Sequence, residues 1–486
     1  MLKSIKKLTK HSMVYGIGSI FSRFFGFLLM PIHTNIFSPE EYSIPTLLFA
    51  SLSILNLIFS YGLDAAFLRF FIIEDSKKEK QRIFSTAFLM LLGTGVCFSS
   101  IMILCPIPFS KMIFQRTEHI TLIQLAGGIL LIDALCLLPF LVLRAEEKST
   151  RFIVLKSLNV IVSLFLNIVF VVILRQGVES IFVANLITSA FTLLLVIPII
   201  LHWFRPAFHR TILVELLRFG LPYIPSGMAV LIMDKIGNFF INRMIGNEAT
   251  GIFSAGVKLG MFMALIVAGF RFAWQPFFLE TSKQEKASQI FARVLTYFIM
   301  VTGFLFLMVS YFIKEIVGFQ ISGVGLIGKD YISGIQIVPL VMLAYIGYGI
   351  YANFIVGIYL KNKTIYFPFV TILGAIVSIT LNIFLIPHMG INGAAWAMFF
   401  SYAVMALALY AVNQHLYPIP YEYSRLLKLF CIFTSLFILS RLNVGQWSIA
   451  YRIGLLIILF PLLEIIRFFN LEEHAAVRKV FRRLFG

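Results

Sequence analysis

The chain has 486 residues, of which 60% are hydrophobic and only 13% are charged, and its formal net charge is +18. A soluble domain carries nearly twice this charged fraction, so the composition excludes an ordinary soluble protein. The basic residues are spread over short loops instead of forming one stripe, which argues against nucleic-acid binding.

Apolar runs of about 20 residues, the length of helix that crosses a bilayer, recur along the whole chain. They predict an all-α polytopic membrane protein with about 14 transmembrane helices. The predicted spans lie near residues 12–32, 44–64, 83–104, 120–142, 153–174, 180–202, 217–241, 249–272, 293–313, 332–359, 365–386, 391–414, 426–441 and 448–468.

Lys and Arg gather in alternate loops, beginning with the N-terminal MLKSIKKLTK. The positive-inside rule places these loops and both termini in the cytoplasm. The basic tail after residue 468 fits an interfacial amphipathic helix and a disordered tail equally well.

Two parts of the chain resemble each other. Residues 38–47 align with residues 246–255, and Tyr15 then aligns with Tyr223. Six spans per repeat give two bundles with the same orientation in the membrane. We therefore expect two pseudo-symmetric six-helix lobes, residues 1–210 and 211–418, followed by two further helices and the basic amphipathic tail in 419–486.

Charged residues inside apolar spans are costly, and by default they face a protein interior or a wet cavity. The candidates for cations that line a lumen are Arg23, Lys235, Lys258 and Arg271, and the intramembrane acids are Asp64, Asp133 and Asp234. Bases outnumber acids, so the interior suits an anion such as a phosphate.

The alternatives differ from residue to residue. Arg23 shares a helix face with small residues, which favours a lumen over an ion pair. Arg271 lies near the end of its span and fits a snorkelling side chain as well as a lumen residue. Asp234 and Lys235 point about 100° apart, so one can face the lumen while the other contacts a neighbouring helix.

The two remaining acids also keep more than one interpretation. Asp133 lies mid-span and either pairs with Arg23 or binds a coupling cation, whereas Asp64 either pairs with Arg69 or caps a helix.

Tyr345, Tyr348 and Asn353 lie close together in the span 332–359. Aromatic faces and amides bind sugar rings, so these residues are candidate sugar contacts. Tyrosine is also common at membrane interfaces, which is the alternative explanation.

Several other signals predict nothing catalytic. Gly323, Gly325 and Gly328 form a GxGxxG pattern without a preceding strand, and no Walker A motif is present. The histidines have no metal-ligand spacing. We expect no enzymatic activity, no metal and no cofactor, and the sequence leaves a coupling ion, Na+ or H+, open.

Six segments together resemble the polysaccharide transporter family, which includes Wzx-type O-antigen and capsule repeat-unit flippases. They are GSIFSRFFGFLLMPIHTNIFSPEEYSIPTL (18–47), YGLDAAFLRFF (61–71), LRAEEKSTRF (143–152), IMDKIGNFFINRMIGNEATGIFSAG (232–256), FAWQPFF (272–278) and LNIFLIPHMGINGAAWAMFFSY (381–402). The family shares a superfamily with the multidrug and toxin extrusion antiporters. This chain has Lys235 where relatives often have an arginine, and a lysine lacks the bidentate fork of that residue.

The resemblance implies a flippase that moves an undecaprenyl-diphosphate-linked oligosaccharide from the inner to the outer leaflet of the bacterial cytoplasmic membrane. It also implies two six-helix bundles around a cavity where Arg23, Lys235 and Lys258 engage the diphosphate, and it makes a polysaccharide polymerase and chain-length proteins the expected partners. The alternatives are a multidrug or cation antiporter, which needs an acidic lumen, and a membrane glycosyltransferase or polymerase, which needs a large outer loop.

Overall fold

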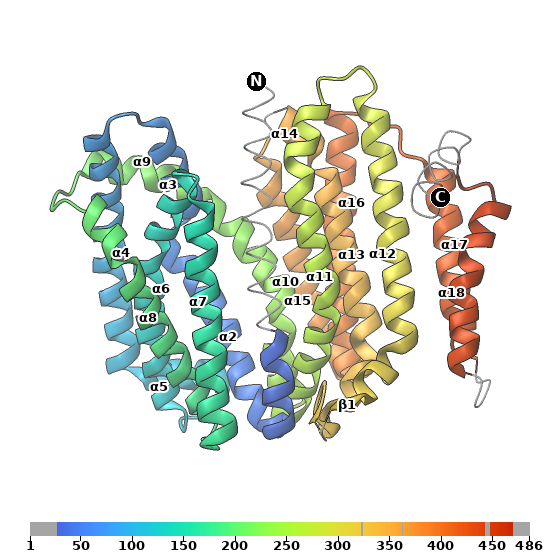
Figure 1. The fold of residues 1–486 in the computed structure, drawn as a ribbon, viewed down its shortest axis with the longest axis horizontal. Helices are drawn as coiled ribbons and strands as arrows, with labels where there is room; N and C mark the ends of the chain where they lie inside the picture. Colours follow the sequence, from blue (N-terminus) through green and yellow to red (C-terminus); the bar gives the residue numbers. More distant parts are fainter. Residues whose placement is uncertain (1–26, 322–323, 362, 443–447, 470–486) are drawn as a thin grey trace.

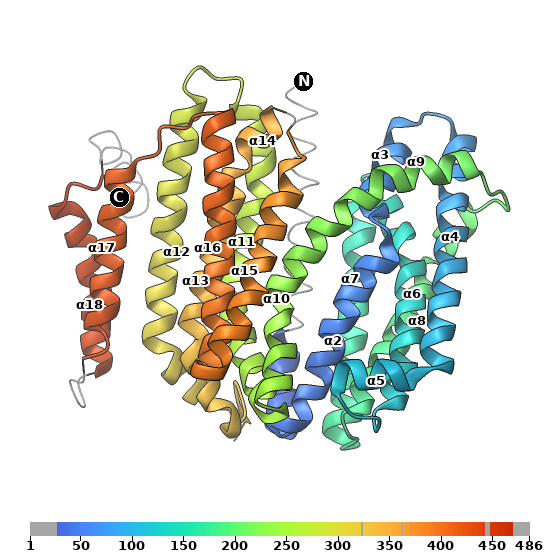
Figure 2. The same cartoon turned by 180° about the vertical axis from the view of Figure 1, so that it is seen from behind.

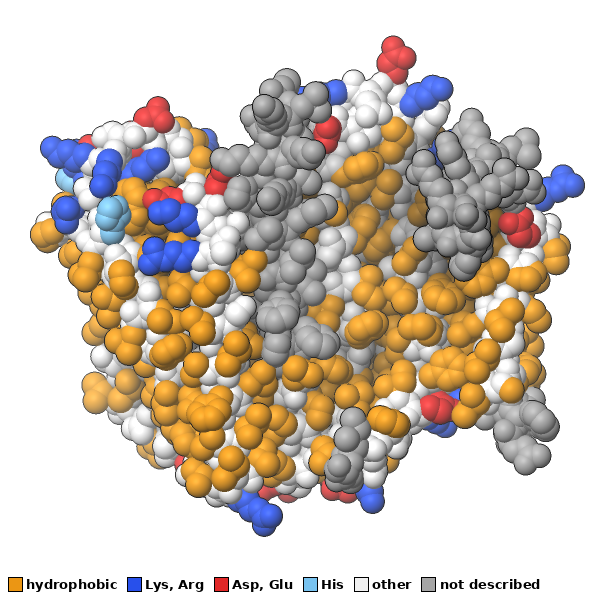
Figure 3. Space-filling view, viewed as in Figure 1, with side chains coloured by type: hydrophobic (Ala, Val, Ile, Leu, Met, Phe, Trp, Pro, Cys, Tyr) orange, Lys and Arg blue, Asp and Glu red, His pale blue; other side chains and the backbone are white. Residues whose placement is uncertain are grey.

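The computed structural model describes residues 27–321, 324–361, 363–442 and 448–469 (Figure 1). Eleven helices in these residues are long and apolar enough to cross a membrane, and Phe27–Ile36 is a shorter apolar helix. On the face shown in Figure 3, hydrophobic side chains cover the middle of the molecule, while Lys, Arg, Asp and Glu gather toward its two ends. The prediction of an all-α polytopic membrane protein is confirmed.

The first bundle contains the helix Phe27–Ile36 and the elements up to α9 (Figure 1). These elements are α2 (Pro39–Ser60), α3 (Leu63–Ile73), α4 (Lys77–Leu104), α5 (Pro106–Phe114), α6 (Ile120–Ala145), α7 (Ser149–Asn167), the π-helix η1 (Ile168–Ile173), α8 (Glu179–Trp203) and α9 (Arg210–Gly220).

The second bundle follows α9. Its elements are η2 (Leu221–Tyr223), α10 (Ile224–Met244), α11 (Asn247–Thr281), α12 (Ala287–Gly318), the hairpin strands β1 (Gln320–Ile321) and β2 (Val324–Gly325), η3 (Lys329–Ile337), α13 (Val338–Phe354), α14 (Val356–Leu360), α15 (Tyr366–Met389) and α16 (Ile391–Leu416). The helices α17 (Tyr423–Leu439) and α18 (Ser448–Ile465) lie beside α12, outside both bundles (Figure 1).

The start of α2 and the start of α11 occupy aligned positions in the repeat. Ser38 caps α2: its hydroxyl accepts from the Glu41 backbone N–H at 3.3 Å, and the Glu41 carboxylate accepts from the Ser38 backbone N–H at 2.9 Å. This reciprocal pair is a capping box. The aligned Gly246 is the N-cap of α11. The helices α2 and α11 therefore begin at matching positions of the repeat.

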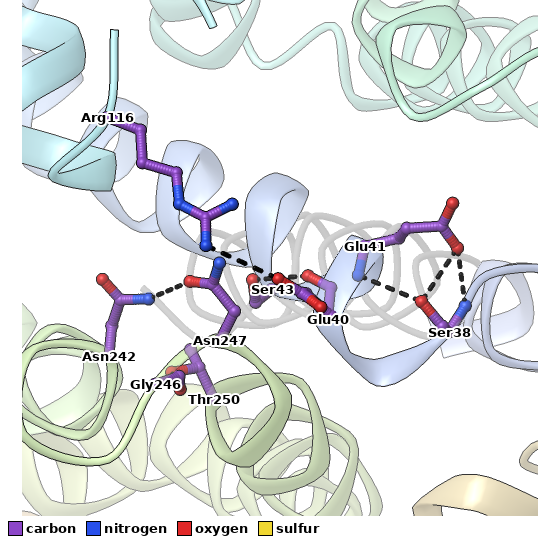
Figure 4. A network of polar contacts seen from close by, with 9 residues as sticks. All are labelled: Ser38, Glu40, Glu41, Ser43, Arg116, Asn242, Gly246, Asn247 and Thr250. Atoms are coloured by element: carbon purple, nitrogen blue, oxygen red, sulfur yellow. Dashed lines mark hydrogen bonds and ion pairs between the residues drawn. The ribbon is translucent and has the colours of Figure 1, made fainter. Parts of the chain in front are cut away.

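The two helix starts lie close to each other (Figure 4), at the end of the molecule where β1 lies (Figure 1), and we call this the closed end. A Cβ on Gly251 would lie 1.9 Å from the Pro39 carbonyl oxygen, so only glycine permits this approach of α11 to α2. Tyr331 donates a hydrogen bond to the Phe37 carbonyl at 2.8 Å, and the Asn35 amide donates to the Gly325 carbonyl at 2.8 Å. These contacts join the bundles.

At the opposite end, α9 crosses the first bundle before the chain enters α10 (Figure 2). Tyr61 and Gly62 are both left-handed, with φ of 51° and 68°, and they separate α2 from α3. A single span was predicted at 44–64, but the apolar stretch is longer and bends here. A Cβ on Gly62 would lie 2.1 Å from the Gly220 carbonyl oxygen.

We expect Gly62→Ala to destabilise the protein by at least about 2 kcal/mol, because alanine is strained at positive φ and its Cβ collides with the backbone of Gly220. Thermal unfolding of the purified protein in detergent measures the change. Gly93→Ala is the matched control, since nothing lies within 4 Å of a Cβ at Gly93. An unchanged melting temperature for Gly62→Ala would contradict the tight packing of Gly62 on Gly220.

Candidate functional site

A cavity of about 300 Å³ lies between the two bundles, and we call it the central cavity. Its walls come from the helix Phe27–Ile36, α2, α7 and α8 on one side and from α10 and α11 on the other. The lining residues are Leu29, His33, Tyr42, Pro45, Thr46, Phe49, Ala50, Ser53, Ser163, Asn167, Ile181, Asn185, Lys235, Asn238, Ser254, Val257, Lys258 and Met261.

Lys258 of α11 reaches across the cavity to the first bundle. Its ammonium group donates a hydrogen bond to the Tyr42 hydroxyl at 2.6 Å and lies 5.0 Å from the centre of the Tyr42 ring. Tyr42 is buried, and its ring stands edge-on to that of Tyr331, with centroids 5.7 Å apart. A lysine of the second bundle is thus held by a fixed aromatic residue of α2.

The adjacent residues Asp234 and Lys235 have different surroundings. Lys235 lines the central cavity, whereas the Asp234 carboxylate accepts a hydrogen bond from the Tyr402 hydroxyl at 2.5 Å. Tyr402 is buried in α16, so Asp234 points into the second bundle. Asp234 and Lys235 therefore do not neutralise each other inside the cavity.

Two polar pairs fix the cavity walls. His33 and Asn167 share a hydrogen bond of 3.0 Å that joins the helix Phe27–Ile36 to the end of α7. The Ser254 hydroxyl donates to the Asn238 amide oxygen at 2.9 Å and joins α11 to α10. Buried polar groups that are paired in this way rigidify their surroundings.

The central cavity is cationic in the part of the chain that the structure describes. Lys235 and Lys258 line it, and no Asp or Glu is among its lining residues. A wet cavity with two ammonium groups and several amide and hydroxyl groups is suited to a phosphate-bearing ligand.

The remaining predicted cations lie elsewhere. Arg23 is outside the described residues. Arg271 is exposed on α11, where its guanidinium carbon lies 4.7 Å from the centre of the Tyr348 ring and its N–H donates to the Tyr348 hydroxyl. Arg271 therefore contacts α13 and does not line the central cavity.

The candidate sugar contacts are not brought to the central cavity. Tyr345 and Asn353 are buried within the second bundle, and the Asn353 amide donates to the Gly349 carbonyl at 3.1 Å. Tyr348 lies between Arg271 and Tyr402, with its ring centre 5.3 Å from that of Tyr402.

The acids of the first bundle also differ from each other. Asp64 is exposed in the first turn of α3, and the nearby Arg69 stacks on the Phe219 ring, 4.4 Å from its centre. Asp133 lines a separate cavity inside the first bundle and accepts a hydrogen bond from the Ser189 hydroxyl at 2.8 Å.

Sequence reasoning missed Tyr42, His33 and Asn238 as cavity residues. Tyr42 lies only three residues after the start of α2, in the segment that aligns with the start of α11. The signal that could have indicated Tyr42 is that a polar aromatic residue stands in the repeated segment close to the start of this helix.

A family profile described as "Polysaccharide biosynthesis protein" matches residues 8–282, more than half of the chain. No protein with a curated description matches the sequence.

Solved structures share the fold at low sequence identity. The lipid II flippase MurJ in an inward closed conformation superposes with a TM-score of 0.71 at 14% identity, covering 93% of this chain and 98% of that chain. An inward-facing MATE family multidrug resistance transporter of the MOP superfamily gives 0.64 at 15% identity, covering 82% and 94%. A MOP superfamily transporter from Pyrococcus furiosus gives 0.55 at 16% identity, covering 85% and 95%.

These matches show that the chain shares the fold of these transporters. The profile match over more than half of the chain shows that it belongs to the polysaccharide biosynthesis protein family.

Proposed function

We propose that this protein is a flippase that moves an undecaprenyl-diphosphate-linked oligosaccharide from the inner to the outer leaflet of the bacterial cytoplasmic membrane. The carrying observation is the central cavity, which lies between two bundles and is lined by two lysines without an acid among the described lining residues. A diphosphate with several sugars cannot cross hydrocarbon unaided, and such a cavity offers it a wet, cationic path. The exported unit would serve O-antigen, capsule or exopolysaccharide synthesis, with a polymerase and chain-length proteins acting next.

The orientation in the membrane follows from the positive-inside rule. The end opposite the closed end carries Arg144, Lys148, Arg205 and Arg210, and basic side chains gather there in Figure 3. We place this basic end and both termini in the cytoplasm. The closed end then faces outward, so the structure corresponds to a state in which the outer side is sealed.

Alternating access provides the transport mechanism. The diphosphate binds near Lys235 and Lys258, and the lipid tail stays in the bilayer. The first bundle, up to α9, and the second bundle, from α10 to α16, then move as two lobes around the bound headgroup, separating α2 from α11 at the closed end. We also propose that transport is coupled to Na+ or H+. The coupling ion is not needed for the diphosphate to bind.

A multidrug or cation antiporter is the second candidate, because MATE transporters share the fold. The central cavity supports this function less well, because an organic cation would meet two lysines there and no acidic side chain among the described lining residues. The transporter from Pyrococcus furiosus is described as having a binding pocket of reverse polarity, which suggests a different function for that protein. Proteins with this fold therefore differ in the polarity of their pockets.

The function is tested by Lys235→Ala in a strain that lacks the native gene. We expect surface polysaccharide to fall about tenfold and lipid-linked oligosaccharide to accumulate, because one charge-assisted contact to the diphosphate is lost. Immunoblotting of surface polysaccharide and mass spectrometry of extracted lipids measure the two pools.

Lys363→Ala is the matched control, because Lys363 is exposed in the loop before α15. Normal polysaccharide in the gene deletion itself, together with increased sensitivity to organic cations, would replace the flippase by the antiporter.

A further inference from the structure

The first bundle contains a second cavity of about 430 Å³, which we call the first-bundle cavity. It lies between α2, α6, α7 and α8. Its lining residues are Asn56, Phe59, Ser60, Asp133, Ala134, Cys136, Leu137, Phe140, Lys156, Asn159, Ser163, Asn185, Thr188, Ser189 and Thr192. Small-molecule sites typically have volumes of about 300–1,000 Å³, so the space is large enough for a ligand.

The first-bundle cavity adjoins the central cavity. Ser163 of α7 and Asn185 of α8 line both of them. A headgroup held by Lys258 and Lys235 therefore has a polar space beside it, deeper in the first bundle.

The lining combines hydrogen-bond donors and acceptors with aromatic faces. Asp133 accepts from Ser189 at 2.8 Å, and the Asn159 amide N–H donates to the Thr192 hydroxyl at 2.7 Å. A carboxylate has about four acceptor positions and an amide oxygen has two, so Asp133 and Asn159 retain acceptors for a ligand.

Lys156 adds a cation to this lining. Its ammonium group lies 4.2 Å from the centre of the Phe140 ring and interacts electrostatically with Asp133 of the same cavity, although no ion pair of Lys156 within 4 Å is found among the described residues. An ammonium group has three donors, and an aromatic face uses none of them as a conventional hydrogen bond. Lys156 therefore retains donors for a ligand.

Polar residues between membrane helices often serve only to pack the helices together. Where that is their role, the side chains fill the space between the helices and leave no cavity. The second bundle shows this alternative: Tyr345, Tyr402 and Met405 are buried between its helices. There, a Cβ on Gly374 would lie 2.6 Å from the Met233 sulfur and 3.3 Å from the Met405 Cβ. The first bundle instead keeps an open polar space at its centre. Since the second bundle packs its helices without such a space, helix packing alone does not explain the first-bundle cavity.

We infer that the first-bundle cavity binds a sugar residue of the lipid-linked oligosaccharide while the diphosphate occupies the central cavity. This inference rests on the proposed function. Sugar hydroxyls both donate and accept, which matches the mixture of Asp133, Lys156, Asn159 and hydroxyl side chains. The Phe59 and Phe140 rings supply apolar surface for the C–H face of a sugar ring.

Cys136 is a natural reporter, because it lines this cavity. The other three cysteines, Cys97, Cys105 and Cys431, are exposed and would be replaced by alanine. In a second protein all four native cysteines are replaced by alanine and Met261→Cys is introduced. Its single cysteine reports on the central cavity, which Met261 lines.

Both proteins are reconstituted in nanodiscs and treated with methyl methanethiosulfonate. The probes are undecaprenyl diphosphate, which has no sugar, and lipid-linked oligosaccharide extracted from source cells that lack this gene.

We expect the oligosaccharide lipid to slow modification of both cysteines at least about fivefold, and undecaprenyl diphosphate to slow only that of Met261→Cys. Protection at residue 261 alone by the oligosaccharide lipid would overturn the sugar subsite and leave the flippase standing. Protection at neither residue would contradict the flippase itself.

A substitution gives an independent measurement. Asn159→Leu is expected to weaken binding of the oligosaccharide lipid about tenfold and to leave undecaprenyl diphosphate binding unchanged, because it removes an amide from the sugar subsite only. Thr94→Leu in α4 is the matched control, since Thr94 lines neither cavity and bonds to the Met90 carbonyl. Equal weakening of both lipids by Asn159→Leu would contradict the assignment.

Discussion

Replacing Lys258 with methionine is expected to lower export of surface polysaccharide by about 10- to 100-fold. The substitution keeps the length of the side chain and removes the ammonium group, and a hydrogen bond to a charged group contributes about 1.5–3 kcal/mol. Lys258→Arg keeps the positive charge and should retain most of the export. Polysaccharide per cell, divided by the amount of membrane-inserted protein, is the measurement.

Two further variants separate binding from folding. Lys314→Met changes an exposed lysine of α12 and should have no effect on export. Tyr42→Phe removes the hydroxyl that accepts from Lys258 at 2.6 Å but keeps the ring beneath the ammonium group, so it should cost less than Lys258→Met. Normal export by Lys258→Met would show that the central lysine does not hold the substrate.

Gly251→Leu is expected to abolish export by preventing the closed end from sealing. Its Cβ would lie 1.9 Å from the Pro39 carbonyl oxygen and 2.7 Å from the Pro39 carbonyl carbon, a distance that a backbone cannot accommodate without moving α2 from α11. A transporter confined to one of two states cannot complete its cycle. A cysteine at Ser254, which lines the central cavity, should then react with a membrane-impermeant maleimide added to whole cells.

The matched control is Gly93→Leu, because a Cβ at this position of α4 has nothing within 4 Å. In that background export should continue, and the cysteine at residue 254 should react much more slowly than in Gly251→Leu, because the closed end opens only transiently. Continued export by Gly251→Leu would mean that the α2–α11 contact does not close the outer path.

The sequence located helices well because lipid imposes long apolar segments. The predicted span at 83–104 falls within α4, and the predicted span at 391–414 within α16. Bends were harder to predict, since the left-handed residues Tyr61 and Gly62 interrupt an apolar stretch without changing its hydropathy.

The candidate site was less predictable than the helices. A charge in a span indicates an interior environment but does not say which one. Lys235 and Lys258 line the central cavity, whereas Arg271 contacts Tyr348 and Asp234 contacts Tyr402. These differences depend on how each helix is rotated against its neighbours, and no local pattern encodes that rotation. Tyr42 and His33 were missed because the prediction rested on Lys, Arg, Asp and Glu within the spans, and tyrosine and histidine are not among these residue types.

The close contact between Gly62 and Gly220 determines where the chain can flex between its two halves. Gly220 ends α9 and is pinned to the first bundle, so a change in angle between the bundles must be absorbed after it. The next residues, Leu221–Tyr223, form a 3₁₀ turn between two α-helices, a conformation that often marks a hinge. With α10 about 30 Å long at 1.5 Å per residue, a rotation of about 10° at this elbow would displace its far end by about 5 Å. That far end is the closed end, so a small swing at the pivot suffices to part α2 from α11.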